Sequence, residues 1–163
     1  MSQLWSYGLV RTVGKAVFFI LLLLPGISPG WEVTRIIDGD TIAVVDADGA
    51  RERVRLYGID SPERWEPCWR QARDFARAMV GGKKVKLKKK GRGKYGRLLA
   101  FVLVEDQDGR LRSLNLELVR AGLARVYSND FAPDSRRTRE KYQRAEIEAT
   151  AGRRGVHGGG CRD

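Results

Sequence analysis

Residues 38–63 read DGDTIAVVDADGARERVRLYGIDSPE, which alternates strand-like segments with turn residues. Thr41 to Asp46 is rich in β-branched residues, and Arg51 to Tyr57 alternates charged with apolar residues, as a half-buried strand does. Between them, the sequence Asp-Ala-Asp-Gly at 46–49 supplies the residues that a hairpin turn requires. This region therefore predicts two antiparallel strands with acidic side chains just beyond their ends.

Three carboxylates and one arginine, Asp40, Asp60, Glu63 and Arg55, lie near these strand ends. If the two strands pair, Asp40 and Asp60 reach one point, where carboxylates with backbone carbonyls and waters suit Ca²⁺. A tight bend at Gly58 would turn Arg55 towards the same pocket. Glu63 could accept a proton from water or orient it. For each acid taken alone, turn formation or a helix N-terminus is the alternative role.

The composition limits the classes of partner that the protein can have. The chain has 163 residues, enough for one domain with a modest core, and carries 31 Lys and Arg against 20 Asp and Glu. The formal net charge of +11 favours a polyanionic partner, either nucleic acid or an anionic membrane, and charge alone does not separate the two. Clustered acids on such a basic protein suggest metal-assisted chemistry on a phosphodiester.

The rest of the chain predicts an α+β fold. Strands clustered early, with one intervening helix and two late helices, favour a small barrel carrying helices. The other predicted strands are 32–37, 83–90, 96–105 and 123–127, and the predicted helices are 69–80, 114–121 and 135–151.

The first thirty residues have the layout of a secretory signal peptide. They contain no acid, and Arg11 and Lys15 precede a nine-residue apolar run, Ala16 to Leu24. Cleavage before Trp31 would give a secreted or periplasmic protein. The alternative is an uncleaved, membrane-anchored chain facing outside the cytoplasm, although the run is short against the ~20 residues of a spanning helix. The predicted organisation is a leader over 1–30, a domain over 31–155 and a flexible glycine-rich tail over 156–163.

The two cysteines, Cys68 and Cys161, leave two possibilities open. In an exported protein they can close a disulfide that ties the tail to the segment after Glu63, and otherwise they are free thiols. A zinc site is disfavoured, because His157 is the single histidine of the sequence and there is no CxxC motif.

Four motifs occur in order along the chain and together carry a resemblance. They are Asp38-Gly39-Asp40-Thr41, Arg55-Leu56-Tyr57-Gly58-Ile59-Asp60-Ser61-Pro62-Glu63, Tyr95-Gly96-Arg97-Leu98-Leu99-Ala100, and Asn115-Leu116-Glu117-Leu118-Val119 with Gly122-Leu123-Ala124. In this combination and spacing they resemble the staphylococcal nuclease family, also called thermonucleases. The resemblance covers roughly residues 33–155.

The resemblance implies an OB-type five-stranded β-barrel with three α-helices and calcium-dependent hydrolysis of DNA and RNA. Water would attack phosphorus and expel the 5′-oxygen, leaving 3′-phosphate ends. By position, Asp40 and Asp60 match the metal carboxylates, and Ser61 replaces a threonine that ligates through its backbone carbonyl. Glu63 matches the general base or water-positioning residue, Arg55 and Arg97 match the phosphate-binding arginines, and Tyr95 and Tyr127 match tyrosines that flank the nucleotide.

The chain departs from the family pattern at two places. Gly93 stands where an aspartate is common, which puts fine substrate positioning in doubt. Gly155-Val156-His157 stands where Gly-Leu-Trp is common, so the tail is expected to pack less well unless Cys161 is bridged. The lysine run 83–94, ending in Lys94, is either a phosphate track beside Arg97 or a solvated strand face.

The sequence therefore predicts an exported, calcium-dependent nuclease of low sequence specificity, acting as a monomer on DNA and RNA without a stable protein partner. One alternative is a non-catalytic OB-type nucleic-acid-binding module, which would be expected to lose metal or arginine positions that this chain retains. Another is a membrane-tethered basic adaptor, against which the short apolar run argues.

Overall fold

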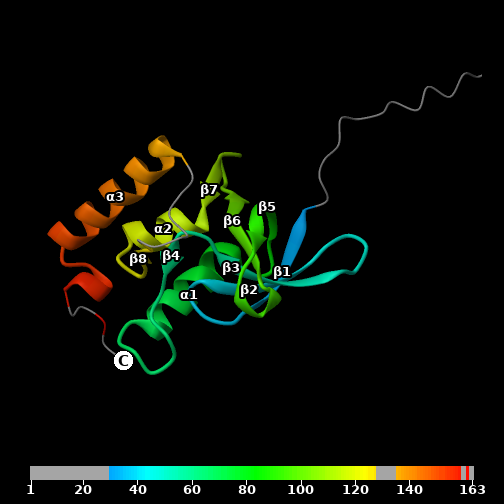
Figure 1. Ribbon diagram of the computed structural model, residues 1–163, viewed down its shortest axis with the longest axis horizontal. Coiled ribbons are helices and arrows are strands. Elements are labelled where there is room, and N and C mark those ends of the chain that lie inside the picture. The colour runs from blue at the N-terminus through cyan, green and yellow to red at the C-terminus, as the bar shows by residue number, and fades with distance from the viewer. Residues whose placement is uncertain (1–29, 128–134, 159–160, 162–163) are drawn as a thin grey trace, which may run out of the picture.

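The computed structural model describes residues 30–127, 135–158 and 161 (Figure 1). The strands are β1 (Trp31–Ile36), β2 (Thr41–Val45), β3 (Arg51–Leu56), β4 (Ile59–Asp60), β5 (Lys84–Arg92), β6 (Leu98–Glu105), β7 (Leu111–Ser113) and β8 (Arg125–Val126). The α-helices are α1 (Trp69–Val80), α2 (Leu114–Arg120) and α3 (Arg136–Ala151), and two 3₁₀ turns are η1 (Lys94–Gly96) and η2 (Gly155–His157).

Five strands form a closed barrel. The sheet order is β3-β2-β1-β5-β6, with antiparallel neighbours, and a parallel pairing of β3 with β6 closes the ring. In that closing pair, Val54 lies opposite Leu98 and Leu56 lies opposite Ala100. The predicted α+β class and the OB-type five-stranded barrel with three helices are thus confirmed.

The barrel interior is filled by the apolar side chains that alternate along each strand. Ile42 and Val44 of β2, and Val54 and Leu56 of β3, are at most 1% exposed. Val102 of β6 is fully buried and belongs to the same core cluster. The alternation leaves Arg51, Arg53 and Arg55 of β3 outside this core, and Arg55 reaches the site described below.

The helices cover one side of the barrel. α1 buries Ala72, Ala76 and Val80, whose small size lets the helix lie close to the sheet. α2 lies between α3 and the rest of the fold (Figure 1). Both α2 and α3 begin at a capping serine, because the side chains of Ser113 and Ser135 accept hydrogen bonds from the N–H groups three residues later.

Short elements depart from the sequence predictions. β4 and β7, of two and three residues, were not predicted as strands of their own. The strand predicted over 83–90 is longer in the structure, because β5 continues through Arg92 with a register irregularity between Lys89 and Gly91. The positive φ of Gly91, 132°, allows the strand to bulge there without ending.

A disulfide joins Cys68 to Cys161, so the structure takes the bridged alternative. Cys68 is buried and immediately precedes α1, and the bond ties the C-terminal segment to the loop that follows Glu63. In the tail, Gly155–His157 forms η2, and the N–H of Val156 donates to Gly122 O (2.9 Å). Residues 159–160 and 162–163 of the predicted tail lie outside the described residues.

None of the helices in the described ranges is long and apolar enough to cross a membrane. The predicted leader lies outside the described residues up to position 29, and β1 begins at Trp31.

Candidate active site

The turn that presents Asp40 connects β1 to β2. Asp38 Oδ1 accepts the N–H of Asp40 (3.1 Å), and Thr41 O accepts the N–H of Asp38 (3.2 Å). Gly39 is buried in this turn, and a Cβ there would lie 2.7 Å from the Cβ of Ala72 and 2.8 Å from Ser61 Oγ. Only glycine therefore lets α1 and the loop after β4 pack directly against the turn, which fixes the position of Asp40.

The Asp40 carboxylate is buried and fully engaged. It is 3% exposed; its Oδ2 accepts the N–H of Ser61 (2.7 Å), and its Oδ1 accepts the hydroxyl of Thr41 (3.1 Å). Arg55 Nη1 lies 2.5 Å from the same Oδ2. Burial raises the pKa of Asp40 to about 7, because desolvation outweighs the attraction of the Arg55 guanidinium, and nearby Asp38 raises it further.

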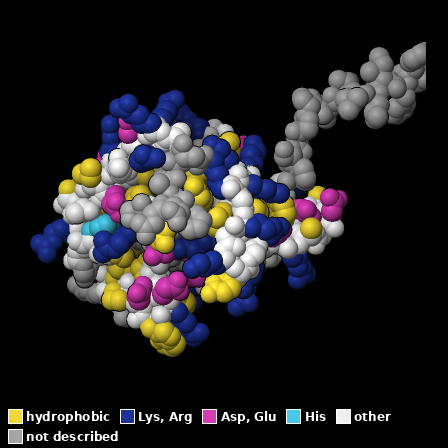
Figure 2. Space-filling view, in the orientation of Figure 1, with side chains coloured by type: hydrophobic (Ala, Val, Ile, Leu, Met, Phe, Trp, Pro, Cys, Tyr) yellow, Lys and Arg dark blue, Asp and Glu magenta, His cyan; other side chains and the backbone are white. Residues whose placement is uncertain are grey.

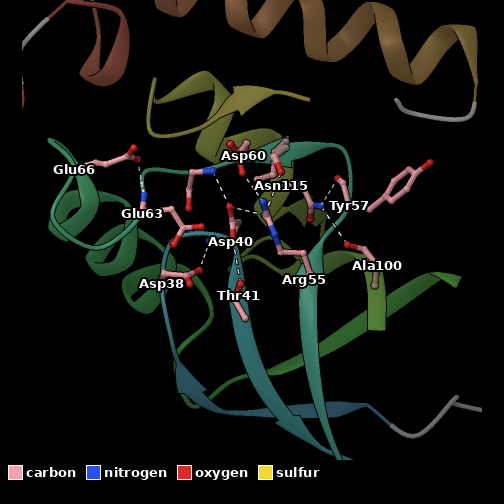
Figure 3. Close-up of polar contacts among 12 residues, drawn as sticks. Asp38, Asp40, Thr41, Arg55, Tyr57, Asp60, Glu63, Glu66, Ala100 and Asn115 are labelled. Atoms are coloured by element: carbon pink, nitrogen blue, oxygen red, sulfur yellow. Dashed lines mark hydrogen bonds and ion pairs between the residues drawn. The ribbon is translucent and has the colours of Figure 1, made fainter. Parts of the chain in front are cut away.

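Arg55 brings the two predicted metal carboxylates together (Figure 3). Besides Asp40, its guanidinium contacts Asp60 Oδ1 through Nη2 (2.6 Å) and donates to Ile59 O through Nη1 (3.1 Å). The bend that turns Asp60 back towards β3 lies at Gly58, whose φ is +78°. A single planar guanidinium therefore spans the two carboxylates, which converge on one point as the sequence predicted.

Asn115 supports this bend and was not identified as a site residue from the sequence. It is fully buried; its Nδ2 donates to Tyr57 O (3.0 Å) and Ala100 O (3.3 Å), and its Oδ1 accepts the N–H of Val102 (3.0 Å). These bonds tie the chain between β3 and β4 to β6. The available signal was an amide on the apolar face of the helix predicted over 114–121, next to Leu114 and in line with Leu118.

Glu63 lies on the loop after β4, beside the carboxylate pair. Its backbone N–H donates to Glu66 Oε2 (2.7 Å), and its exposed side chain extends from the loop towards Asp40 (Figure 3). Glu63 and Asp38 both line a groove of about 740 Å³ that begins at this point. Glu63 is thus accessible to solvent while it faces the site; Asp60 is also exposed, but its carboxylate is engaged by Arg55.

Arg97 approaches from the other side of the site, just before β6. Its Cζ lies 5.9 Å from the centroid of the Tyr95 ring, and Tyr95 itself is 92% exposed with a φ of 62°. Arg97 Nε is buried and has no hydrogen-bond partner within the described part of the chain. Leu99 pairs with Arg55 in the closing strand pair, so Arg97 lies two residues upstream of that neighbour. Lys94 is exposed in η1.

Tyr127 lies next to the bend. It follows β8, which pairs with β4 so that Arg125 lies opposite Asp60, and its backbone N–H donates to Gly58 O (3.0 Å). The structure therefore brings Tyr127 to the Asp60 side of the site and Tyr95 to the Arg97 side.

The lysine strand meets the site at one end. β5 runs antiparallel to β6, so Arg92 lies opposite Leu98 near Arg97, whereas Val85 lies opposite Val104 at the far end. Arg92 is paired with Glu52 (2.6 Å). Of the lysine run, Lys94 is the member nearest to Arg97 in the sequence.

The predicted cation fits the chemistry of these donors. Asp40 and Asp60 already converge on one positive group, and carboxylate oxygens are the ligands that hard cations prefer. Among residues 30–127, 135–158 and 161, no three His, Cys, Asp or Glu side chains are grouped for metal binding. A bound cation would therefore depend on two carboxylates, with Ser61 and water supplying further oxygens.

Comparison with known proteins identifies the family. The family model described as "Staphylococcal nuclease homologue" matches residues 53–157. The thermonuclease of Staphylococcus intermedius is 36% identical over 125 residues, covering 72% of this chain and 69% of the relative, and that of Staphylococcus hyicus is 32% identical over 127 residues (73% and 70%). An uncharacterized endonuclease of Escherichia coli O157:H7 is 40% identical over 95 residues (58% and 59%). The chain therefore belongs to the staphylococcal nuclease family.

Proposed function

We propose that this protein is an exported, calcium-dependent nuclease that hydrolyses phosphodiester bonds of DNA and RNA with little sequence specificity. The observation that carries the proposal is the convergence of Asp40 and Asp60 on Arg55 at the rim of a strongly basic barrel. Lys and Arg side chains are spread over the face drawn in Figure 2, and acidic side chains gather in its lower part. Phosphate contacts made by such a surface carry no sequence information.

Calcium would be held by Asp40, Asp60 and the backbone carbonyl of Ser61. When bound, such an ion stabilises charge on a phosphoryl oxygen and makes water a better nucleophile. The protein's part is to fix the two carboxylates, which it does through Ser61, Thr41 and the Gly39 turn.

The remaining steps of the reaction are carried out by side chains of the site. Glu63 takes a proton from the attacking water while the water oxygen forms its bond to phosphorus. The bond from phosphorus to the 5′-oxygen breaks, and that oxygen takes up a proton from solvent, leaving a 3′-phosphate and a 5′-hydroxyl. Arg55 and Arg97 donate N–H groups to the phosphate oxygens as their negative charge grows.

Both arginines have donors left for a phosphate. Arginine has five N–H groups, and Arg55 uses three of them on Ile59, Asp40 and Asp60. The buried Nε of Arg97 lacks a partner among the described residues, and a buried unsatisfied donor is costly. A phosphate oxygen would satisfy it. Tyr95, Tyr127 and Lys94 would flank the nucleotide around this contact.

The leader and the disulfide support export. The leader has the charge and apolar pattern of a signal peptide, and the Cys68–Cys161 bond is of the kind that persists in oxidising compartments. If the leader stays attached, the same nuclease would be membrane-anchored and face outside the cytoplasm.

The proposal is tested by incubating the full chain with plasmid DNA and with RNA, in Ca²⁺ and in excess chelator. Both substrates are expected to be degraded in Ca²⁺ only, with ends that carry 3′-phosphates. Degradation that continues in chelator would contradict calcium dependence. Binding to nucleic acid without degradation in any divalent cation would identify the protein as a non-catalytic binding module.

Arg97→Lys is expected to lower kcat by about 10²-fold with little change in KM, because a lysine cannot give the planar fork that a transferring phosphate requires. Single-turnover rates in saturating Ca²⁺ measure the effect directly. Arg53→Lys, at an exposed position on β3, is the matched control and should retain the wild-type rate. A near-normal kcat for Arg97→Lys would show that the residue contributes only charge.

A further inference from the structure

A basic groove extends from Glu63 along the outer edge of β1, on the side of the site away from Arg97. We name it the Arg–Trp groove and define it by Arg35, Arg64, Trp69, Arg73 and Arg77. Its volume of about 740 Å³ is within the ~300–1,000 Å³ range of ligand pockets.

The groove runs along β1 towards the catalytic residues. It is lined by Val33 to Ile36 of β1, of which Val33 lies beside Gly82, and by Ile37 and Asp38 of the following turn, where the Asp38 carboxylate accepts the N–H of Asp40. From Val33 to Ile36 the strand spans about 10 Å, before the turn continues the groove to Asp38. A linear ligand that lies in the groove would therefore reach the carboxylate site at the end marked by Asp38 and Glu63.

Tryptophan faces orient the guanidinium groups of the groove. The Cζ of Arg73 lies 4.6 Å from the ring centroid of Trp69, and that of Arg64 lies 6.0 Å from Trp69 and 4.7 Å from Trp65. Stacking of this kind engages the face of a guanidinium and leaves its N–H edge able to donate. Stacking thus holds the guanidinium groups in place without using their N–H groups, although Arg73 also donates to Asp74 through Nε and Nη2.

The charges of the groove favour a polyanion. Four arginines line it against two acids, and both acids lie at the catalytic end. Arg73 and Arg77 share Asp74 Oδ1 (3.2 and 3.1 Å), whereas neither Arg35 nor Arg64 forms an ion pair with a described residue. A solvated basic surface would need neither the concave shape nor the stacked tryptophan.

We propose that the Arg–Trp groove binds the sugar-phosphate backbone of the nucleic-acid strand on one side of the bond to be cleaved. The strand would pass from the Arg97 side, across Asp40 and Glu63, and continue along β1. The position of the cleaved bond rests on the proposed function, but binding in the groove is measurable without cleavage.

The test measures fluorescence anisotropy of a labelled oligothymidylate of about 12 nucleotides, a length that one OB fold can bind. Chelator is present, so that no cleavage occurs. The full chain is compared with the groove variant Arg35→Gln/Arg64→Gln/Arg73→Gln. We expect Kd to rise by roughly 10-fold or more, and the slope of log Kd against log salt to fall by about 2, since each phosphate contact contributes ~0.7.

The matched control removes the same charge from α3, in the variant Arg139→Gln/Lys141→Gln/Arg144→Gln, whose side chains are all exposed. It should change Kd by less than about 3-fold, the size expected of a non-specific effect of net charge. Equal losses in the two variants would overturn the proposal. If loss of the Arg73–Asp74 pair lowers the melting temperature, Arg35→Gln/Arg64→Gln gives the same comparison with two charges.

Two further measurements separate the remaining outcomes. In Ca²⁺, the groove variant should raise KM for a long strand far more than KM for a di- or trinucleotide. A wild-type chain that cleaves nothing would refute the proposed function, while the anisotropy result would still decide the groove. A variant that loses binding to phosphatidylserine vesicles but keeps its oligonucleotide affinity would make the groove a membrane contact and overturn the proposal.

Discussion

Replacement of Asp40 by asparagine is expected to abolish Ca²⁺-dependent cleavage, by at least ~10²-fold, while the protein stays folded. The amide keeps the size of the side chain and an oxygen that can accept the N–H of Ser61, but it removes the negative charge that a cation requires. Cleavage of plasmid DNA and calorimetric Ca²⁺ binding would be measured on the same preparation. Asp60→Asn should lose cleavage in the same way.

The stability of the Asp40 variant separates its proposed functional role from a structural one. The pKa of Asp40 is raised from 3.8 to about 7, so between these values the folded protein binds a proton that the unfolded chain has released. Without cation, this contribution to stability is complete below about pH 3.8 and is lost as the pH rises to about 7. Asparagine does not titrate. In chelator, the melting temperature of Asp40→Asn relative to that of the wild type should therefore rise as the pH increases from about 3.8 to about 7. At higher pH this difference should stay constant.

Asp106→Asn is the control for this measurement, because Asp106 also accepts N–H groups in a turn, from Asp108 and Arg110, but far along the chain from the site. It should retain full activity. An Asp40→Asn protein that cleaves normally in Ca²⁺ would remove Asp40 from the cation site. A large fall in its melting temperature at neutral pH would mean that the Arg55–Asp40 pair supports the fold.

The main elements were predictable because they depend on patterns along the chain. The apolar spacing over 69–80 predicts α1 with its observed bounds, and the alternation over 51–57 predicts β3 to within one residue. The convergence of Asp40 and Asp60 also followed from the sequence, because paired strands and a glycine bend at 58 leave few other arrangements. Local chemistry and tertiary structure agree at these positions.

The rest depends on contacts between distant segments. β4 exists only because β8 pairs with it, and a two-residue strand has no pattern of its own. The need for glycine at position 39 comes from Ala72 and Ser61, which no local rule places beside it. The Arg–Trp groove likewise joins Arg35 of β1 to arginines of α1, which lie far away in the sequence.

Asn115 shows the same limit for the site itself. An amide on the apolar face of a helix indicates a buried hydrogen-bonding role, but the identity of its partners depends on the closed barrel. The disulfide was an open choice for a related reason. Whether Cys161 reaches Cys68 depends on how the chain after α3 returns, and η2 docks on Gly122 through backbone contact that the sequence does not reveal.

Glu63→Gln is expected to lower kcat by at least ~10²-fold, the lower end of what a positioned general base contributes, with little change in KM or in Ca²⁺ affinity. Glutamine keeps the size of the side chain but cannot take the proton of the attacking water. The loop that carries Glu63 should keep its shape, because the Ser61 N–H bond to Asp40 and the bond from the Glu63 N–H to Glu66 involve no atom of the Glu63 side chain. The variant should therefore melt at the wild-type temperature.

Glu66→Ala is the informative control, because it removes the acceptor of the Glu63 N–H and would affect the rate only by loosening the loop. Its effect on kcat should be much smaller and should come with a lowered melting temperature. If Glu63→Gln instead has a normal rate and a lowered melting temperature, then Glu63 stabilises the loop and takes no part in the reaction. In that case the proton would have to leave the attacking water for solvent, and the rate of the wild type should rise with buffer concentration.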